Sequence, residues 1–493
     1  MNRYRMYTGI IISLLFLLLC FSSQGRLILS LPDNHRMVVG ERNTIDINLP
    51  RQLETQFEIE IPGTSQSVLA SPQNSPVSIT KNDSGYEIAA LKPGKVQLQL
   101  KLLGYIPLKS IAIETMAPKR VIPGGHSIGV LLQSKGIMVV GFAPVVRENG
   151  DKIYPARDNG VQIGDLILAV NGQGVKDETD LAQIVDSSQN SGLELRIKRK
   201  DKYLTVPVNA QLCPETQRYR IGLYVRDGVV GVGTLTFWDP DTWNYAALGH
   251  IILDADTRQG IDVLKGKIIS ASIQTIKAGK PGKPGEKIGV FDNSGKIEGS
   301  INKNGAFGIY GKTQTQVSNQ LSDYPLEVGY AHQVRTGPAE IYTVVNGTDI
   351  EKFTIEIEKV YPERKNGKGM VIKVIDPRLL SLTGGIIQGM SGSPIIQESK
   401  IVGAVTHVFL NDPQHGYGIF MDQILSDIPQ ADPVDQASLG QIQTYLGPPS
   451  KIFDKAEESR PELSQSQPGL DLTQLIPIIR ARLCIIMGAV AII

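Results

Sequence analysis

Apolar and polar residues alternate along most of the chain, and this alternation predicts strands rather than helices. Between residues 27 and 118, stretches such as FEIEIP, YEIAAL and KVQLQLKLL repeat with a period of two residues and are interrupted by Pro, Gly and Asn. Such a period gives each segment one core-facing side and one solvent-facing side. We therefore expect a β-rich N-terminal domain at 27–118. We interpret it as a spacer or docking domain, because it holds no catalytic cluster.

A second unit is expected at 119–210, after the Pro- and Gly-rich start of this range. It contains two strand patterns, a turn, one segment with helical spacing at Asp177–Ser188 and a closing hairpin. Gly164-Asp165-Leu166-Ile167, followed by Asn171-Gly172, resembles the G-D-x-I-x-x-[IV]-N-G motif of PDZ domains. The stretch of about 85 residues as a whole is similar to that family.

The PDZ resemblance implies a peptide-binding loop at Ile128, Gly129 and Val130. In such a loop, glycine lets backbone N–H groups converge on a peptide carboxylate, while the next strand pairs with the peptide. A PDZ fold that serves only as a scaffold is the alternative interpretation.

The third unit, at 211–430, is rich in glycine and in strand patterns and has few helical ones. We expect an all-β double barrel or sandwich, so that the whole chain is mainly β. The sequence of residues 431–493 is polar and interrupted by Pro and Gly, which predicts a disordered tail. It ends in eleven apolar residues, Leu483–Ile493, which are too few to span a bilayer unaided.

Composition narrows the classes of function. A chain of 493 residues exceeds one ordinary domain, and its net charge of +1 gives no reason to expect nucleic acid as a partner. The three cysteines, Cys20, Cys213 and Cys484, make neither a disulfide framework nor a Cys-based zinc site. We expect no cofactor and no metal, since the sequence shows no His, Asp and Glu cluster with ligand spacing.

The N-terminus, residues 1–26, predicts export. Arg3 and Arg5 precede an apolar run from Gly9 to Phe21, which is the order of an export signal. The run is short for a spanning helix, and a cleaved signal and a retained anchor both remain open. In either case we expect the bulk of the chain outside the cytoplasm.

Candidate chemistry lies in the stretch GMSGSP, Gly389–Pro394. A serine between small residues on a tight turn can act as a nucleophile if a base activates it and backbone N–H groups hold the oxyanion. Ser391 is the candidate nucleophile, and the N–H groups of Gly389 and Ser391 are the candidate oxyanion donors. The turn is similar to the GDSGGP turn of chymotrypsin-like proteases. An ordinary β-turn is the competing interpretation.

Six histidines are candidates for the base. His250 follows Ala-Ala-Leu-Gly, a setting similar to that of the trypsin-like base, and His407 is the rival because it follows Ser391 closely. A third residue would fix the imidazole tautomer. Asp376, which ends a strand before a proline, is the first choice, and Asp254 and Asp256 are alternatives.

Several blocks together resemble the stage IV sporulation protein B (SpoIVB) peptidase family, and they cover the third unit: RIGLYVRDGVVGVGTLTFWDP, ALGH, KPGKPGEKIG, TGGIIQGMSGSPII and GAVTHVFLNDPQHGYGIF. The resemblance implies a membrane segment, a PDZ domain and a trypsin-like serine peptidase domain, in that order. It implies Ser391 as nucleophile, His250 as base and Asp376 as a third residue.

The same resemblance implies a self-cleaving endopeptidase that signals during endospore formation. It would act in the space between the two forespore membranes, where it would cut a membrane-bound regulator of pro-sigma-K processing. Its implied partners are this substrate and, through the PDZ domain, other copies of itself. Two alternatives stay open at this point: a catalytically inert PDZ protein that binds peptides, and a structural component of the envelope.

Overall fold

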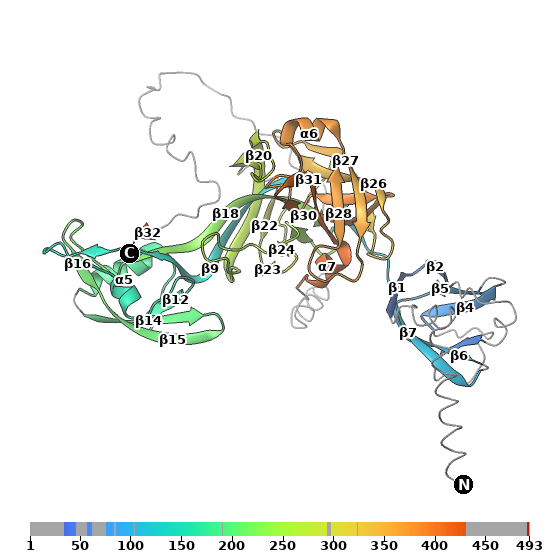
Figure 1. Ribbon diagram of the computed structural model, residues 1–493, viewed down its shortest axis with the longest axis horizontal. Helices are drawn as coiled ribbons and strands as arrows, with labels where there is room; N and C mark the ends of the chain where they lie inside the picture. Colours follow the sequence, from blue (N-terminus) through green and yellow to red (C-terminus); the bar gives the residue numbers. More distant parts are fainter. Residues whose placement is uncertain are drawn as a thin grey trace, which may run out of the picture. The chain divides into compact units, whose positions relative to one another are not determined.

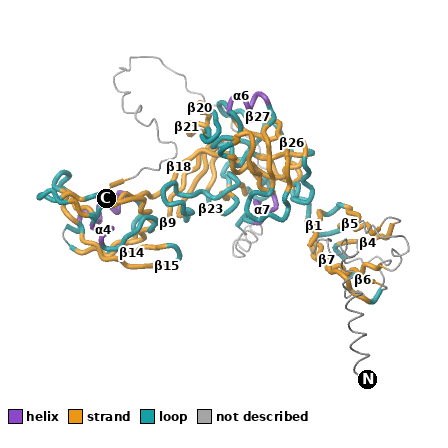
Figure 2. Tube along the Cα trace, viewed as in Figure 1, coloured by secondary structure: helices purple, strands orange, loops and turns teal. Residues whose placement is uncertain are grey.

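Strands dominate the computed structural model of this chain, as Figure 2 shows, and the mainly β prediction is confirmed. The structure describes residues 34–45, 57–61, 75–82, 85–102, 104–189, 191–292, 297–322, 324–429 and 491–492. The helices in these ranges are short: α4 (Pro155–Asp158), α5 (Glu178–Ser187), α6 (Pro377–Thr383) and α7 (Met421–Ser426). None of these helices has the length and apolar character needed to cross a membrane. The predicted export segment and nearly all of the predicted tail lie outside the described residues.

The chain divides into two units, residues 1–120 and 121–493. The first unit holds a four-stranded and a three-stranded sheet. The four-stranded sheet has the order β1 (Asn34–Val38), β7 (Ile106–Met116), β6 (Gly94–Leu102) and β3 (Phe57–Glu60). The other has the order β2 (Arg42–Ile45), β5 (Gly85–Ala90) and β4 (Val77–Asn82). Alternate residues of both sheets fill one shared core, as the period-two pattern predicts.

The second unit begins with a core that gathers the predicted PDZ segments. This core runs from Ile137 to Val225 and includes Leu181 and Val185 of α5. Its main strands are β12 (Leu166–Val170), β14 (Gly192–Arg199), β15 (Lys202–Asn209), the second half of β9 (Ser127–Phe142) and the first residues of β18 (Leu223–Trp238). The core therefore extends past residue 210, where we had placed the end of this domain, into β18.

Two sequence signals explain this local fold. Asp177 caps α5 by accepting a hydrogen bond from the Asp180 N–H, so the helix begins and ends where its spacing predicts. The Asp165 carboxylate of the Gly-Asp motif is fully buried, and both of its oxygens accept from Arg199 at 2.7 Å. The motif's aspartate thus ties two strands of the PDZ region together rather than facing a ligand.

β9 and β18 are each sixteen residues long and continue from the PDZ region into a first barrel (Figure 1). That barrel follows the order β9, β18, β19 (Asn244–Ala247), β24 (Gly308–Lys312), β22 (Glu298–Ser300) and β20 (Val263–Lys277). The bridge between Gly299 and Thr313 connects β22 to the end of β24 and closes the ring. Its apolar core is separate from the PDZ core.

A second antiparallel barrel follows in sequence. It closes in the order β26 (Gly337–Val344), β27 (Ile350–Val360), β28 (Met370–Val374), β31 (Asp412–Phe420), β30 (Lys400–Phe409) and β29 (Pro394–Gln397), which returns to β26. The remaining strands are β8 (Arg120–Pro123), β10 (Val145–Val146), β11 (Lys152–Ile153), β13 (Gln173–Gly174), β16 (Gln211–Cys213), β17 (Arg218–Arg220), β21 (Glu286–Asp292), β23 (Lys303–Gly305), β25 (Leu326–Val328) and β32 (Ala491–Ile492).

The structure corrects the predicted peptide-binding loop. Ile128, Gly129 and Val130 lie within β9, in its barrel half, and pair with β18 on one edge and β20 on the other. A strand with both edges paired has no backbone groups left for a peptide. The prediction was wrong because a short Gly-containing apolar stretch fits a loop entry and a buried central strand equally well.

Candidate active site

Ser391 lies on a turn of the second barrel, between α6 and β29, and is half-buried. The glycines on either side of Met390-Ser391 have left-handed backbones, with φ of 92° at Gly389 and 94° at Gly392. A Cβ on Gly392 would lie 2.1 Å from the Thr234 carbonyl oxygen. Only glycine satisfies both the conformation and the close approach. The small residues of the motif therefore serve a packed turn, as the sequence predicts.

Most backbone N–H and C=O groups of this turn form hydrogen bonds. Thr234 donates its N–H to the Ser391 carbonyl and its hydroxyl to the Gly389 carbonyl, at 3.1 and 2.7 Å. Gly392 donates to Val405 and Ser393 donates to Met390. The N–H groups of Gly389 and Ser391, in contrast, donate to no group in the part of the chain that the structure describes. These two are the predicted oxyanion donors, and a turn fixed at its other groups would hold them ready for one.

His250 comes from the first barrel, directly after β19, and backbone packing brings its segment to the serine turn. Leu248 and Gly249 both have positive φ, at 71° and 70°, so the chain bends sharply before the histidine. The Gly392 Cβ position lies 2.4 Å from the Leu248 amide nitrogen, so the two segments touch through their backbones. The turn that holds Ser391 and the segment that holds His250, 141 positions apart in the sequence, thus come together where the two barrels join.

The hydrogen bonds of the two side chains show the resting geometry. The Ser391 hydroxyl donates to the Thr406 carbonyl at 2.7 Å, and no hydrogen bond joins it to His250 among the described residues. His250 Nδ1 lies 2.9 Å from the Ile251 carbonyl oxygen. A carbonyl can only accept, so Nδ1 carries the proton and Nε2 holds the free lone pair that a base requires. Burial lowers the pKa of His250, which favours the neutral ring.

His407 lies beside His250, with ring centroids 5.2 Å apart. It follows Thr406, the residue whose carbonyl accepts from Ser391. Burial, together with the charges of His250 and Lys368, lowers the pKa of His407 to about 4. Both histidines that the sequence put forward as the base are thus at the site.

The predicted third residues have other partners. Asp376 caps α6, where its carboxylate accepts from the N–H groups of Arg378, Leu379 and Thr354. Asp254 and Asp256 pair with Arg226 at 2.7 and 2.9 Å. Among the described residues, none of the three forms a hydrogen bond or ion pair with His250, and the Ile251 carbonyl accepts the hydrogen bond from the imidazole Nδ1. Membership of Asp376 in a triad stays a prediction.

Lys287 lies beneath the serine turn and was not identified from the sequence. Its side chain is 2% exposed, and its Cβ lies 3.1 Å from where a Cβ on Gly389 would be. Its Nζ donates to the Thr343 hydroxyl oxygen at 2.7 Å, which also accepts from Ser393 at 3.0 Å. Burial lowers the pKa of Lys287 to about 7. In KPGEKIG this lysine looks like any surface lysine, and only the fold buries it.

Replacing Lys287 with methionine should stabilise the protein at pH 7, with an advantage that shrinks at higher pH. The unfolded lysine keeps its proton up to 10.5, whereas the folded one loses it near 7. Between these values the unfolded chain binds more protons, so wild-type stability rises with pH, by roughly 5 kcal/mol at 1.36 kcal/mol per unit. Urea unfolding of both proteins from pH 6 to 10 measures this difference. Lys277→Met, at an exposed ion pair with Glu286, is the control and should show no such trend.

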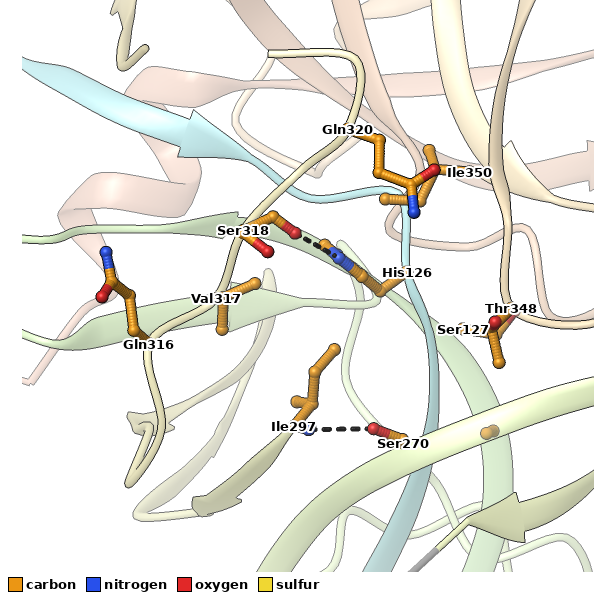
Figure 3. Close-up of a pocket in the computed structure, with 11 residues that line it drawn as sticks. His126, Ser127, Ser270, Ile297, Gln316, Val317, Ser318, Gln320, Thr348 and Ile350 are labelled. Carbon is orange, nitrogen blue, oxygen red and sulfur yellow. Dashed lines mark hydrogen bonds between the residues drawn. The ribbon is translucent and has the colours of Figure 1, made fainter. Parts of the chain in front are cut away.

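The second unit also contains a cavity of about 380 Å³ (Figure 3). Its lining includes His126, Ser127 and Gln320 but no residue of the Ser391 turn or the His250 segment. His126 Nε2 donates to the Ser318 carbonyl, and burial lowers the pKa of this histidine to about 4, so the ring is neutral at pH 7. The chemistry of Ser391 therefore does not take place in this cavity. Among the described residues, no cluster of His, Cys, Asp and Glu could hold a metal ion.

Comparison with known proteins adds to this geometry. Residues 217–425 match the family model of the SpoIVB peptidase S55, and residues 147–199 match that of a PDZ domain. The Rv3671c protease of M. tuberculosis in its active form is 14% identical and has a TM-score of 0.22; the match covers 52% of this chain and 90% of that one. The inactive form of the Rv3671c protease is also 14% identical, with a TM-score of 0.22, and the match covers 40% of this chain and 82% of that one. At TM-scores this low we draw nothing from these two structures.

Proposed function

We propose that the chain is a PDZ-containing serine endopeptidase of the SpoIVB type and that it acts in endospore formation by cutting a membrane-bound regulator of pro-sigma-K processing. The observation that carries the catalytic part is the contact between the Ser391 turn and the His250 segment at the junction of the barrels, next to two N–H groups that have no acceptor among the described residues. The family match supports the cellular role. The inert peptide-binding alternative has no such support.

Acylation begins when substrate binds and the Ser391 hydroxyl turns from the Thr406 carbonyl toward His250. His250 Nε2 takes the hydroxyl proton while Oγ attacks the scissile carbonyl carbon. The developing oxyanion accepts hydrogen bonds from the Gly389 and Ser391 N–H groups. These fixed donors take the place of the water molecules that would otherwise solvate the negative charge. The Ile251 carbonyl stabilises the imidazolium through Nδ1–H. The protonated His250 then gives its proton to the leaving amine.

Deacylation repeats the same steps with water. His250 removes a proton from the water as it attacks the acyl carbon, and Ser391 leaves with that proton restored. The mechanism needs no metal or cofactor. Its rate depends on how well the two barrels hold Ser391 and His250 in register, because each comes from a different barrel.

The cellular setting forms part of the proposal. An exported chain, anchored or secreted through residues 1–26, would act between the two forespore membranes and also cut itself. The PDZ domain would hold the substrate or another copy by strand addition. The basic and apolar order at the N-terminus and the family's architecture support this setting.

The test is an intact-mass and gel time course of the full chain in membranes that contain the regulator of pro-sigma-K processing. Wild type should produce fragments of itself and of the regulator, and Ser391→Ala should produce neither. If the self-fragments form but the regulator stays whole, the sporulation role is wrong while the peptidase stands. If Ser391→Ala cuts as fast as wild type, the assignment of Ser391 is wrong.

A further inference from the structure

The first residues of β18 form an edge of the PDZ region that carries an extra strand. On one side, Leu223 to Arg226 pair with β9. On the other side, Tyr224 pairs with Ile492 and Val225 with Ala491, antiparallel, so β32 extends the sheet (Figure 1). The segment that adds this strand is thus part of the same chain, far away in sequence.

The surroundings of this edge suit strand addition. α5 packs next to it, since Leu181 and Val185 share one core with Leu223 and Val225. The Asp186 carboxylate at the end of α5 also accepts from the Tyr219 N–H of β17. A helix beside an open strand edge is the arrangement in which PDZ domains take up an extended peptide.

The direction of β32 is a second observation. Because the pairing is antiparallel, a peptide in this register runs toward the turn at Ile221 and Gly222. Gly222 has a φ of 78°, and a Cβ there would lie 2.6 Å from the Ala143 carbonyl oxygen, so glycine is required. A glycine turn at this end of the strand is the feature that the sequence analysis assigns to Ile128–Val130, where glycine would let backbone N–H groups converge on a peptide carboxylate.

The sequence around β32 complements this edge. Ala491 and Ile492 are apolar, and residues 485–493 around them read IIMGAVAII without a charged side chain, so the sequence here is compatible with a strand that adds apolar side chains to the sheet. Residues 430–490 connect it covalently to the second barrel. A tether of this kind gives a local concentration of up to about 1 mM, so that even a weak strand competes well with free peptides.

We propose that the Ala491–Ile492 segment is an internal ligand of the PDZ region, bound as a strand on β18, which an apolar peptide partner must displace. The proposal does not depend on peptidase activity. It predicts a PDZ edge that is occupied until a competing peptide, or loss of the segment, opens it.

The test uses the full chain with Ser391→Ala, so that self-cleavage cannot remove the segment. Ala491→Pro with Ile492→Pro removes both N–H groups of the added strand. Ser464→Pro with Gln465→Pro is the matched control in the polar part of the tail. Two quantities are measured: amide hydrogen exchange over residues 221–227, and the affinity of a fluorescent peptide with the sequence of residues 486–493.

Exchange over 221–227 should be at least about tenfold faster in the 491/492 variant than in the parent and the control. The labelled peptide should bind this variant roughly tenfold more tightly, because the internal competitor is gone. Equal exchange and equal affinity in all three proteins would overturn the proposal. Protection that disappears on dilution would also overturn it, since the strand would then come from a second copy. Thermal melting checks that each variant is folded.

Discussion

Replacing His250 with alanine should slow the acylation of Ser391 by about 10⁴-fold or more, whereas His407→Ala should slow it by less than about tenfold. Without a base, the serine hydroxyl keeps its proton and is a poor nucleophile at pH 7. His250 has Nδ1–H held by a carbonyl and Nε2 free, which is the tautomer of a base. The rate of labelling by a fluorophosphonate measures acylation directly.

His415→Ala is the control, because its side chain is engaged by Asp412 and Glu358 instead of the site. If His407→Ala abolished labelling while His250→Ala retained it, His407 would be the base instead of His250.

The pH profile of labelling gives a further check. Burial lowers the pKa of His250, and only the neutral ring can accept a proton. Labelling should therefore persist as the pH falls below 6.5 and be lost as it passes through this lowered pKa.

Replacing Arg226 with methionine should destabilise the second unit by about 3–5 kcal/mol. Its guanidinium is 4% exposed and pairs with the buried Asp254 and the half-exposed Asp256. Burial alone would raise the pKa of Asp254, but hydrogen bonds from Thr257 and Arg226 hold it below its ordinary value. Removal of the guanidinium leaves a buried carboxylate without its counter-charge, which is why the expected effect is large. Urea unfolding at pH 7 measures it.

Two further variants sharpen this prediction. Arg157→Met breaks an ion pair whose side chains are 48% and 50% exposed, and exposed pairs contribute at most about 1 kcal/mol. Arg226→Met with Asp254→Asn removes both buried charges and should recover part of the loss. A loss in Arg226→Met no larger than in Arg157→Met would contradict the buried-pair explanation. Since Asp254 follows His250 by four residues, the single variant should also slow acylation.

The N-terminal β-rich domain and α5 could be predicted because their signals are local. Alternation with a period of two puts the same residues in the core whatever the neighbouring strands are. An Asp before a helical pattern caps it from within the same turn. The motif around Ser391 also carries a local reason, since two positive-φ glycines bound a tight turn.

Sequence reasoning failed where the outcome depended on pairing across long distances. Ile128-Gly129-Val130 has the composition of a loop entry, but β18 and β20 pair with both of its edges. The end of the PDZ region could not be set at residue 210, because β18 serves both the PDZ core and the first barrel. The local sequence RIGLYV does not indicate whether these residues belong to the PDZ core or to the first barrel.

The sequence by itself determined the strand-rich character, the serine turn and a pair of candidate histidines, because residue type and short spacing dictate these. Tertiary structure alone decided which groups meet. It joined the Ser391 turn to the His250 bend through Gly392, buried Lys287 beneath the turn and gave the imidazole Nδ1 the Ile251 carbonyl as a partner. Barrel closure brings together residues that are far apart in the chain, and a linear pattern carries no information on which backbone groups will then be within hydrogen-bond distance.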